Sequence, residues 1–376
     1  MKTSITNYII SFIAIVSASV LYNWYEEKQL KMKEMNDYTD IQKYLLSDED
    51  LGKSVKPILW IHIPYEYNSR NWISFGSRTS LELNQPYLYL TIKSIIMKCD
   101  ESFKICVIDD TSFEKLIPGW NINMKTISRP IITNMRELGM MKLLYMYGGM
   151  ICPCSFLCMR NLIGMYEKGT RTGNMFICEN NDRSVSSTET QFIPDISFCG
   201  SPKENYEVKE LTHFIQHIIS TDYTAESRFL NEIGQWCLRK IKMGKIVLIN
   251  GIEIGVKCEN SRPIKIEDLM SSNYLDLSSE TYGIFIPARD ILMRRQYEWF
   301  ARLSEKQVLE SDTIIGKYML INVGSGVRNG RANFVEPLQN KPEKWVGFWK
   351  TPNVSLYGQK PNFLGDNILV EKYPNY

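Results

Sequence analysis

The chain has 376 residues, enough for one large domain or two ordinary ones, and its hydrophobic (44%) and charged (23%) fractions are those of a globular protein. This composition excludes wholesale disorder and a polytopic membrane protein. Because 44 Lys and Arg nearly cancel 42 Asp and Glu, no strong electrostatic field indicates a nucleic-acid partner, and we expect none. Three His and the lack of an HExxH or paired CxxC pattern argue against a standard zinc enzyme.

The N-terminal residues predict a membrane anchor. Ile5 to Tyr25 carry no charge, and at about 1.5 Å per residue a helix of that length crosses the bilayer hydrocarbon. Tyr22, Trp24 and Tyr25 lie where an interfacial aromatic belt is expected. Residues 1–25 are therefore predicted to be a single-pass transmembrane helix, with its orientation open. A cleaved signal peptide is the alternative, because Val16-Ser17-Ala18 offers small residues at a cleavage point.

Three further parts follow the anchor. Residues 26–52 are charged and rich in Met, which is typical of a solvated helical stalk. Residues 53–340 are predicted to form one α/β domain. Residues 341–376 are rich in Pro, Gly, Asn and aromatic residues, and we expect this segment to pack on the domain surface.

The domain begins with a strand–helix–strand pattern. An apolar run at Pro57–Pro64 predicts a buried parallel strand, 87–98 has helical periodicity, and Phe103–Ile108 predicts a second strand that ends at Asp109-Asp110. The later predicted elements are a helix at 134–147, apolar runs at 150–157 and 174–179, helices at 204–219 and 224–242, and a short strand at 245–250.

Nine cysteines are too few for a disulfide scaffold of this length, and the odd number leaves at least one unpaired within the monomer. Those in apolar runs, such as Cys106 and Cys178, are predicted to be buried small hydrophobes. Cys152, Cys154 and Cys158 form a C-x-C-x3-C cluster that could hold a metal or form redox pairs, although no second pair follows at finger spacing.

The most informative stretch is Leu143-Leu-Tyr-Met-Tyr-Gly-Gly149, followed by an apolar run and by Phe156-Leu-Cys-Met-Arg-Asn-Leu162. It resembles the capsular-polysaccharide-synthesis and Och1-like mannosyltransferase type of sugar-transferring enzyme. In their GT-A domain, a helix ending LLY-x-YGG leads into an apolar strand that ends in Asp-x-Asp. The resemblance covers roughly residues 56–180 and implies a GT-A-like fold.

The chain departs from this family at the metal site. The resemblance implies two carboxylates that hold Mn²⁺ or Mg²⁺ against a nucleotide-sugar diphosphate, yet the Asp-x-Asp positions fall on Pro153-Cys154-Ser155. The family's upstream Ser-Asp-x-x-Arg falls on Arg136, Glu137 and Met140, so only its acid is kept. We therefore expect no metal site and no cofactor; Mn²⁺ or Mg²⁺ belongs only to the enzyme interpretation.

The candidate nucleotide-sugar-binding residues, by this resemblance and by their place at strand ends, are Asp109, Asp110, Glu137, Gly148, Gly149 and Ser155. No catalytic residue can be assigned. The three acids are expected to line one cleft and to repel a diphosphate, so that Mn²⁺ and UDP- or GDP-sugars should give no thermal shift. Cations that could replace the metal are Arg129, Arg136 and Arg160, each interpreted as an ordinary surface residue.

Two functions remain open. One is a membrane-anchored glycosyltransferase that works through a divergent or metal-independent site, with a nucleotide sugar and a glycan acceptor as partners. The other is a catalytically inactive pseudo-glycosyltransferase that acts as a structural component of a membrane or virion. The Tyr-Gly-Gly and Pro-x-Ser-Phe-Leu-Cys stretches also resemble membrane-anchored, Asp-x-Asp-lacking proteins of large DNA viruses, and this implies a host or virion membrane as the location.

Overall fold

The computed structural model describes residues 22, 25, 56–64, 85–127, 130–221 and 225–324. The chain separates into two units, residues 1–48 and 49–376. In the first unit Tyr22 and Tyr25 are described, and both are helical and exposed. The rest of the predicted anchor, the stalk at 26–52 and the segment at 341–376 lie outside the described residues. Among those that are described, no helix is both long and apolar enough to cross a bilayer.

A six-stranded sheet organises the second unit, with strand order β2-β1-β3-β6-β5-β7. Five strands run parallel, and β6 alone is antiparallel to its neighbours β3 and β5. Its strands are β1 (Ile58–His62), β2 (Lys104–Ile108), β3 (Gly149–Ile151), β5 (Met175–Asn181), β6 (Phe192–Ser201) and β7 (Ile246–Ile249). A separate two-stranded sheet pairs β4 (Phe156–Cys158) with β8 (Gly283–Phe285). The fold is thus mixed α/β with a mostly parallel central sheet, as the predicted strand–helix–strand pattern indicated.

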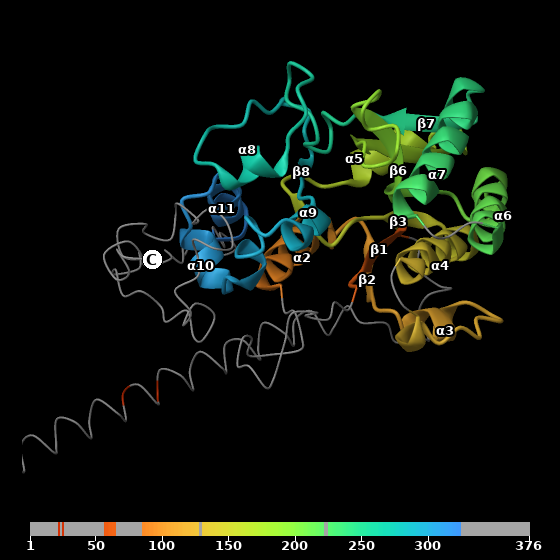
Figure 1. The fold of residues 1–376 in the computed structure, drawn as a ribbon, viewed down its shortest axis with the longest axis horizontal. Coiled ribbons are helices and arrows are strands. Elements are labelled where there is room, and N and C mark those ends of the chain that lie inside the picture. The colour runs from red at the N-terminus through yellow and green to blue at the C-terminus, as the bar shows by residue number, and fades with distance from the viewer. Residues whose placement is uncertain are drawn as a thin grey trace, which may run out of the picture. The chain divides into compact units, whose positions relative to one another are not determined.

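Helices cover both faces of this sheet (Figure 1). The chain moves from β1 to β2 in one direction and from β2 to β3 in the other, so right-handed crossovers place α2 and α4 on opposite faces. Trp60 and His62 of β1 face α4: the Trp60 Nε1 donates to the Gly148 carbonyl at 3.0 Å, and His62 approaches Arg136 through Asp110. The helices are α2 (Pro86–Cys99), α3 (Ser112–Leu116), α4 (Ile131–Tyr147), α5 (Ile163–Thr170), α6 (Tyr206–Thr221) and α7 (Glu226–Lys242).

Short helices complete the described chain: α8 (Ile266–Met270), α9 (Ala288–Met293), α10 (Glu305–Glu310) and α11 (Ile314–Met319). Single turns lie at η2 (Met124–Thr126), η3 (Phe300–Arg302) and η4 (Leu320–Gly324). The late elements α10, η3 and η4 pack against the early helix α2, which Figure 1 shows as blue ribbon beside orange. Tyr87 of α2 and Phe300 are both fully buried there, with ring centroids 5.2 Å apart.

The glycine pair has the conformation that its position between a helix and a strand requires. Gly148 (φ 69°) caps α4 and Gly149 (φ 99°) begins β3, and L-residues rarely adopt either φ. A Cβ on Gly149 would lie 2.1 Å from the Ile58 carbonyl oxygen of β1, and one on Gly148 would lie 2.6 Å from the Lys203 nitrogen. The predicted helix-to-strand junction is confirmed, and close backbone approach adds a second reason for glycine.

The structure corrects two sequence expectations. The apolar run at 150–157 is not one strand: β3 ends at Ile151, the chain turns through Pro153, and β4 belongs to the other sheet. Proline supplies no backbone N–H to a ladder, which explains the break. The ten-residue strand β6 was not predicted, because Pro194, Asp195 and Gly200 interrupt its apolar pattern.

Candidate functional site

The carboxyl ends of the five parallel strands share one edge of the sheet, and the start of β6 lies at the same edge. Strand order reverses between β1 and β3, since β2 and β3 flank β1 on opposite sides. In open α/β sheets, ligands bind at the carboxyl edge near such a switch point. A ligand is therefore expected at this edge, near β1 and β3.

A cluster of hydrogen-bonded charged and polar side chains occupies the β1–β2 side of the edge. The Arg136 guanidinium of α4 donates to both oxygens of Asp110, from Nε at 2.8 Å and from Nη2 at 2.6 Å. The His62 Nε2 lies 2.9 Å from Asp110 Oδ1, and the His62 ring stacks on Phe113 with centroids 5.3 Å apart. Burial would raise the pKa of Asp110, but the hydrogen bonds from His62 and Arg136 outweigh it and lower the pKa to about 2.

Arg136 is therefore not the surface cation that the sequence analysis assumed. Its residue exposure is only 8%, and its charge is compensated by Asp110. Arg160 does lie exposed, where it donates to the Ser279 carbonyl at 2.7 Å and stacks over Tyr282. Arg129 lies outside the described residues.

The side chain of Asp109, next to Asp110, accepts hydrogen bonds from the two residues that follow Asp110. Its Oδ1 accepts from the backbone nitrogens of Thr111 and Ser112, both at 3.0 Å, and from both hydroxyls. Burial opposes these hydrogen bonds, yet the pKa of Asp109 is lowered. The side chain thus fixes the turn that leads into α3.

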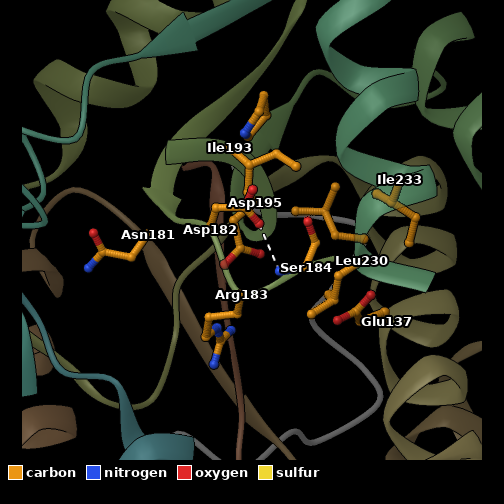
Figure 2. A pocket seen from close by; sticks show the side chains of 11 residues that line it. Glu137, Asn181, Asp182, Arg183, Ser184, Ile193, Asp195, Leu230 and Ile233 are labelled. Atoms are coloured by element: carbon orange, nitrogen blue, oxygen red, sulfur yellow. Dashed lines mark hydrogen bonds between the residues drawn. The ribbon is translucent and has the colours of Figure 1, made fainter. Parts of the chain in front are cut away.

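Glu137 points to a different part of the edge, a pocket between the end of β5, the start of β6, α4 and α7 (Figure 2). Asp182, Arg183, Asp195, Leu230 and Ile233 are among the residues that line it. The cavity volume is about 20 Å³, room for about one ordered water. Asp109 and Asp110 are not part of this lining, so the structure does not bring the three predicted acids into one cleft.

The carboxyl group of Glu137 is held in an apolar and acidic environment. Its Oε2 is sealed from solvent and has no hydrogen-bond partner among the described residues. Burial, reinforced by the nearby Asp195 carboxylate, raises the pKa of Glu137 to about 8, against the opposing effect of Arg183 and Arg289. Glu137 is thus protonated and neutral at pH 7.

Hydrogen bonds fix the other acids of the pocket. Asp195 accepts from the Asn180 amide at 2.7 Å and from the Ser197 nitrogen at 2.9 Å. Asp182 accepts from the Ser184 nitrogen at 2.7 Å, and the same carboxylate holds the loop that connects β5 to β6. Hydrogen bonds among its own residues therefore hold this part of the pocket wall in place.

The segment that replaces Asp-x-Asp is folded into the protein. Ser155 and Cys154 are buried, with exposures of 5% and 9%. The Thr91 hydroxyl of α2 donates to the Cys154 carbonyl at 2.5 Å, and the Ile286 nitrogen donates to the Ser155 carbonyl at 3.2 Å. The backbone that would present metal ligands is thus tied to α2 and to the chain after β8. No group of three or more His, Cys, Asp or Glu suited to a metal ion occurs within the described ranges.

No protein-family model and no curated protein matches this sequence. The geometry itself divides the predicted residues into three sets: Asp109 and Asp110 beside β2, Glu137 in the β5–β6 pocket, and Gly148, Gly149 and Ser155 around β3.

His62 and Asp195 are site residues that the sequence did not indicate. His62 could have been identified as the polar end of an otherwise apolar strand, two residues before Pro64. Asp195 lies on the strand that was not predicted, so no local pattern separates it from solvated charges. Arg183 ends the polar run 179–183 after an apolar stretch, a position from which the sequence does indicate that a side chain could contact a substrate.

Proposed function

We propose that this chain is a glycosyltransferase-like protein of GT-A type that handles a nucleotide sugar without a divalent cation. The observation that carries the proposal is the helix–Gly148-Gly149–strand unit at the switch point of a mostly parallel sheet, with Pro153-Cys154-Ser155 after β3 where the resemblance implies the metal-binding acids. The sheet edge supports ligand binding, and the side chains there favour chemistry without a metal.

The electrostatics of the edge support an anionic ligand better than the sequence suggested. Arg136 compensates the charge of Asp110, and Glu137 is protonated below about pH 8. Two of the three acids expected to repel a diphosphate therefore contribute little negative charge at pH 7. Arg183, on the pocket wall at the end of β5, adds positive charge to the same edge, and a guanidinium can bind phosphate oxygens in a bidentate manner.

A second candidate is an inactive domain that serves as a structural component of a membrane or virion assembly. The burial of Cys154 and Ser155, and the ties from Thr91 and Ile286, favour it. These contacts turn the segment that holds the metal in active relatives into part of the core. Fold alone does not decide between the two candidates.

Thermal unfolding of the full-length chain with UDP- and GDP-sugars separates them. In EDTA, a nucleotide sugar near 100 times its Kd should stabilise a binding-competent protein by about 2.7 kcal/mol, which raises the thermal midpoint by roughly 4 °C for a domain of this size. Arg183→Met should remove most of this shift, whereas Arg160→Met, which changes an exposed cation elsewhere, should keep it.

Each outcome has a clear meaning. A shift in EDTA that is lost in Arg183→Met supports metal-independent binding. A shift that requires Mn²⁺ contradicts the proposal, because it restores a metal site that Pro153 and Ser155 cannot provide. Failure of all donors in both buffers favours the structural role.

A further inference from the structure

Two buried thiols from distant parts of the chain meet beside the segment that replaces Asp-x-Asp. Cys99 is the last residue of α2 and Cys158 the last of β4, and neither is exposed. Their Sγ atoms lie 3.9 Å apart. The two thiols lie on different elements and contact each other, whereas a cysteine that only fills an apolar core needs no second thiol beside it.

The surrounding backbone holds the two cysteines together. The Cys158 nitrogen donates to the Ser94 hydroxyl of α2 at 2.9 Å, one helical turn and a half before Cys99. Beyond both cysteines, the Asn161 amide donates to the Ser102 hydroxyl at 2.7 Å. These two hydrogen bonds bracket the thiols and hold α2 against β4, and the Sγ atoms, 3.9 Å apart, must approach to about 2.0 Å to bond.

We propose that Cys99 and Cys158 are a modification site, a dithiol that a small-molecule disulfide such as oxidised glutathione converts into a disulfide between α2 and β4. The Cys99 thiolate attacks one sulfur of the small disulfide, forming a mixed disulfide and releasing one thiolate. Cys158 then attacks the Cys99 sulfur, and its proton goes to the second thiolate, which leaves as a thiol. The two cysteines lose two electrons in total, and the small disulfide becomes two thiols.

The environment gives the two sulfurs different roles. The hydrogen bond between the two sulfurs lowers the pKa of the Cys99 thiol, so Cys99 is the attacking group in this proposal. Burial raises the pKa of Cys158 well above its ordinary value, so Cys158 resolves the mixed disulfide. The product would join residues 59 positions apart and would fix the turn through Pro153, which lies between the two elements.

Cys152 is the competing partner, because its thiol also lies in the electrostatic neighbourhood of Cys99. It follows β3 and its Sγ is directed toward the Pro153 carbonyl, 3.8 Å away. Since trypsin leaves Cys152, Cys154 and Cys158 on one peptide, cleavage after Phe156 is needed to tell them apart.

The test is a thiol map of the full-length protein across glutathione redox buffers, made on native protein and on protein refolded in the same buffers because both thiols are buried. Free thiols are alkylated after an acid quench, and peptides from trypsin with chymotrypsin are identified by mass spectrometry. Cys99→Ala and Cys158→Ala are compared with Cys106→Ala, which changes a buried cysteine on β2.

We expect a Cys99–Cys158 peptide that appears as oxidised glutathione increases and disappears in dithiothreitol. Oxidation should raise the thermal midpoint of the wild type and of Cys106→Ala by about 5 °C or more, and should leave Cys99→Ala and Cys158→Ala unchanged. Alkylation of Cys99 at every redox ratio in both preparations, or a bond from Cys99 to Cys152, overturns the proposal. If a variant fails to fold, the wild-type peptide map decides alone.

Discussion

Two regions of one sheet edge hold partly buried acids in opposite charge states. Beside β1 and β2, Asp110 is ionised and its charge is compensated by Arg136 and His62. Beside β5 and β6, Glu137 has an unpartnered oxygen and remains neutral because burial and Asp195 raise its pKa. Arg136 and Glu137 are neighbours on α4, so one turn of helix supplies a cation to the first region and an acid to the second.

This difference shows that the charge of a residue cannot be inferred from its type at such an edge. An acid with a bidentate guanidinium is ionised at almost any pH, whereas an acid in an apolar pocket is not. The first region is fixed by its charges, and the second changes its charge near neutral pH. The following substitutions test the comparison, from the largest expected effect to the smallest.

Arg136→Met should have the largest effect, because it leaves the Asp110 carboxylate buried with His62 as its remaining side-chain partner. We expect a loss of about 3 kcal/mol or more in the free energy of unfolding, measured by urea titration. Arg160→Met, the exposed control, should cost less than about 1 kcal/mol. Adding Asp110→Asn to Arg136→Met should recover part of the loss; a loss below 1 kcal/mol in Arg136→Met would show that the cluster is not tightly coupled.

Gly149→Ala tests the strand that separates the two regions. The new Cβ would meet the Ile58 carbonyl of β1 at 2.1 Å in a backbone conformation that suits glycine, so we expect a loss of about 3 kcal/mol. Gly173→Ala is the matched control, since its φ is also positive (76°) but the space around it is open; it should cost about 1 kcal/mol. Equal losses in denaturant titrations would mean that φ, and not strand contact, sets the requirement.

Glu137→Gln should change the pH dependence of stability. The folded pKa of Glu137, about 8, lies above its unfolded value, so its contribution is full at acid pH and is lost as pH rises through 8. Between pH 8 and pH 6 the wild type should gain about 2 kcal/mol from this group. Glu137→Gln should lack that gain, and Glu189→Gln, at an exposed position, should keep it. An unchanged slope in Glu137→Gln would place the titration elsewhere.

Asp109→Ala should have the smallest effect. It removes the acceptor for the Thr111 and Ser112 nitrogens in the turn before α3, and the loss of such hydrogen bonds at an exposed position costs about 1 kcal/mol. Asp276→Ala, at an exposed position, should be nearly neutral in the same thermal and urea measurements. A loss above 3 kcal/mol for Asp109→Ala would mean that Asp109 contributes as much to the free energy of unfolding as the pair of Asp110 and Arg136.

The local elements of the first half were predictable from sequence. Apolar runs bounded by proline or by acids gave β1 and β2, helical periodicity gave α2 and α4, and the glycine pair marked the end of α4. These features depend on neighbours in the chain. The resemblance to GT-A enzymes used the same local stretch, and the assignment of that family remains a proposal.

The missed features depend on contacts between distant residues. Strand β6 is stabilised by β3 and β5 on its two sides, so it tolerates Pro194 and Asp195 that weaken its own pattern. The role of Arg136 on α4 depends on Asp110, which lies in the loop after β2 and is 26 residues earlier in the chain. The two regions of the edge therefore could not be distinguished before their residues were placed in space.

The strand pairing also has a consequence for the order in which the chain can fold. Strands β5 and β6 are consecutive and antiparallel, so they can pair soon after both are synthesised. Strand β1 can pair on one side only after β2 has been synthesised. On its other side it can pair only after β3, which follows the long helix α4. Because Leu59, Trp60 and Ile61 are large hydrophobic residues and are fully buried in the finished protein, the nascent chain exposes an incompletely paired hydrophobic strand until the glycine pair has left the ribosome. Aggregation competes with folding during that interval.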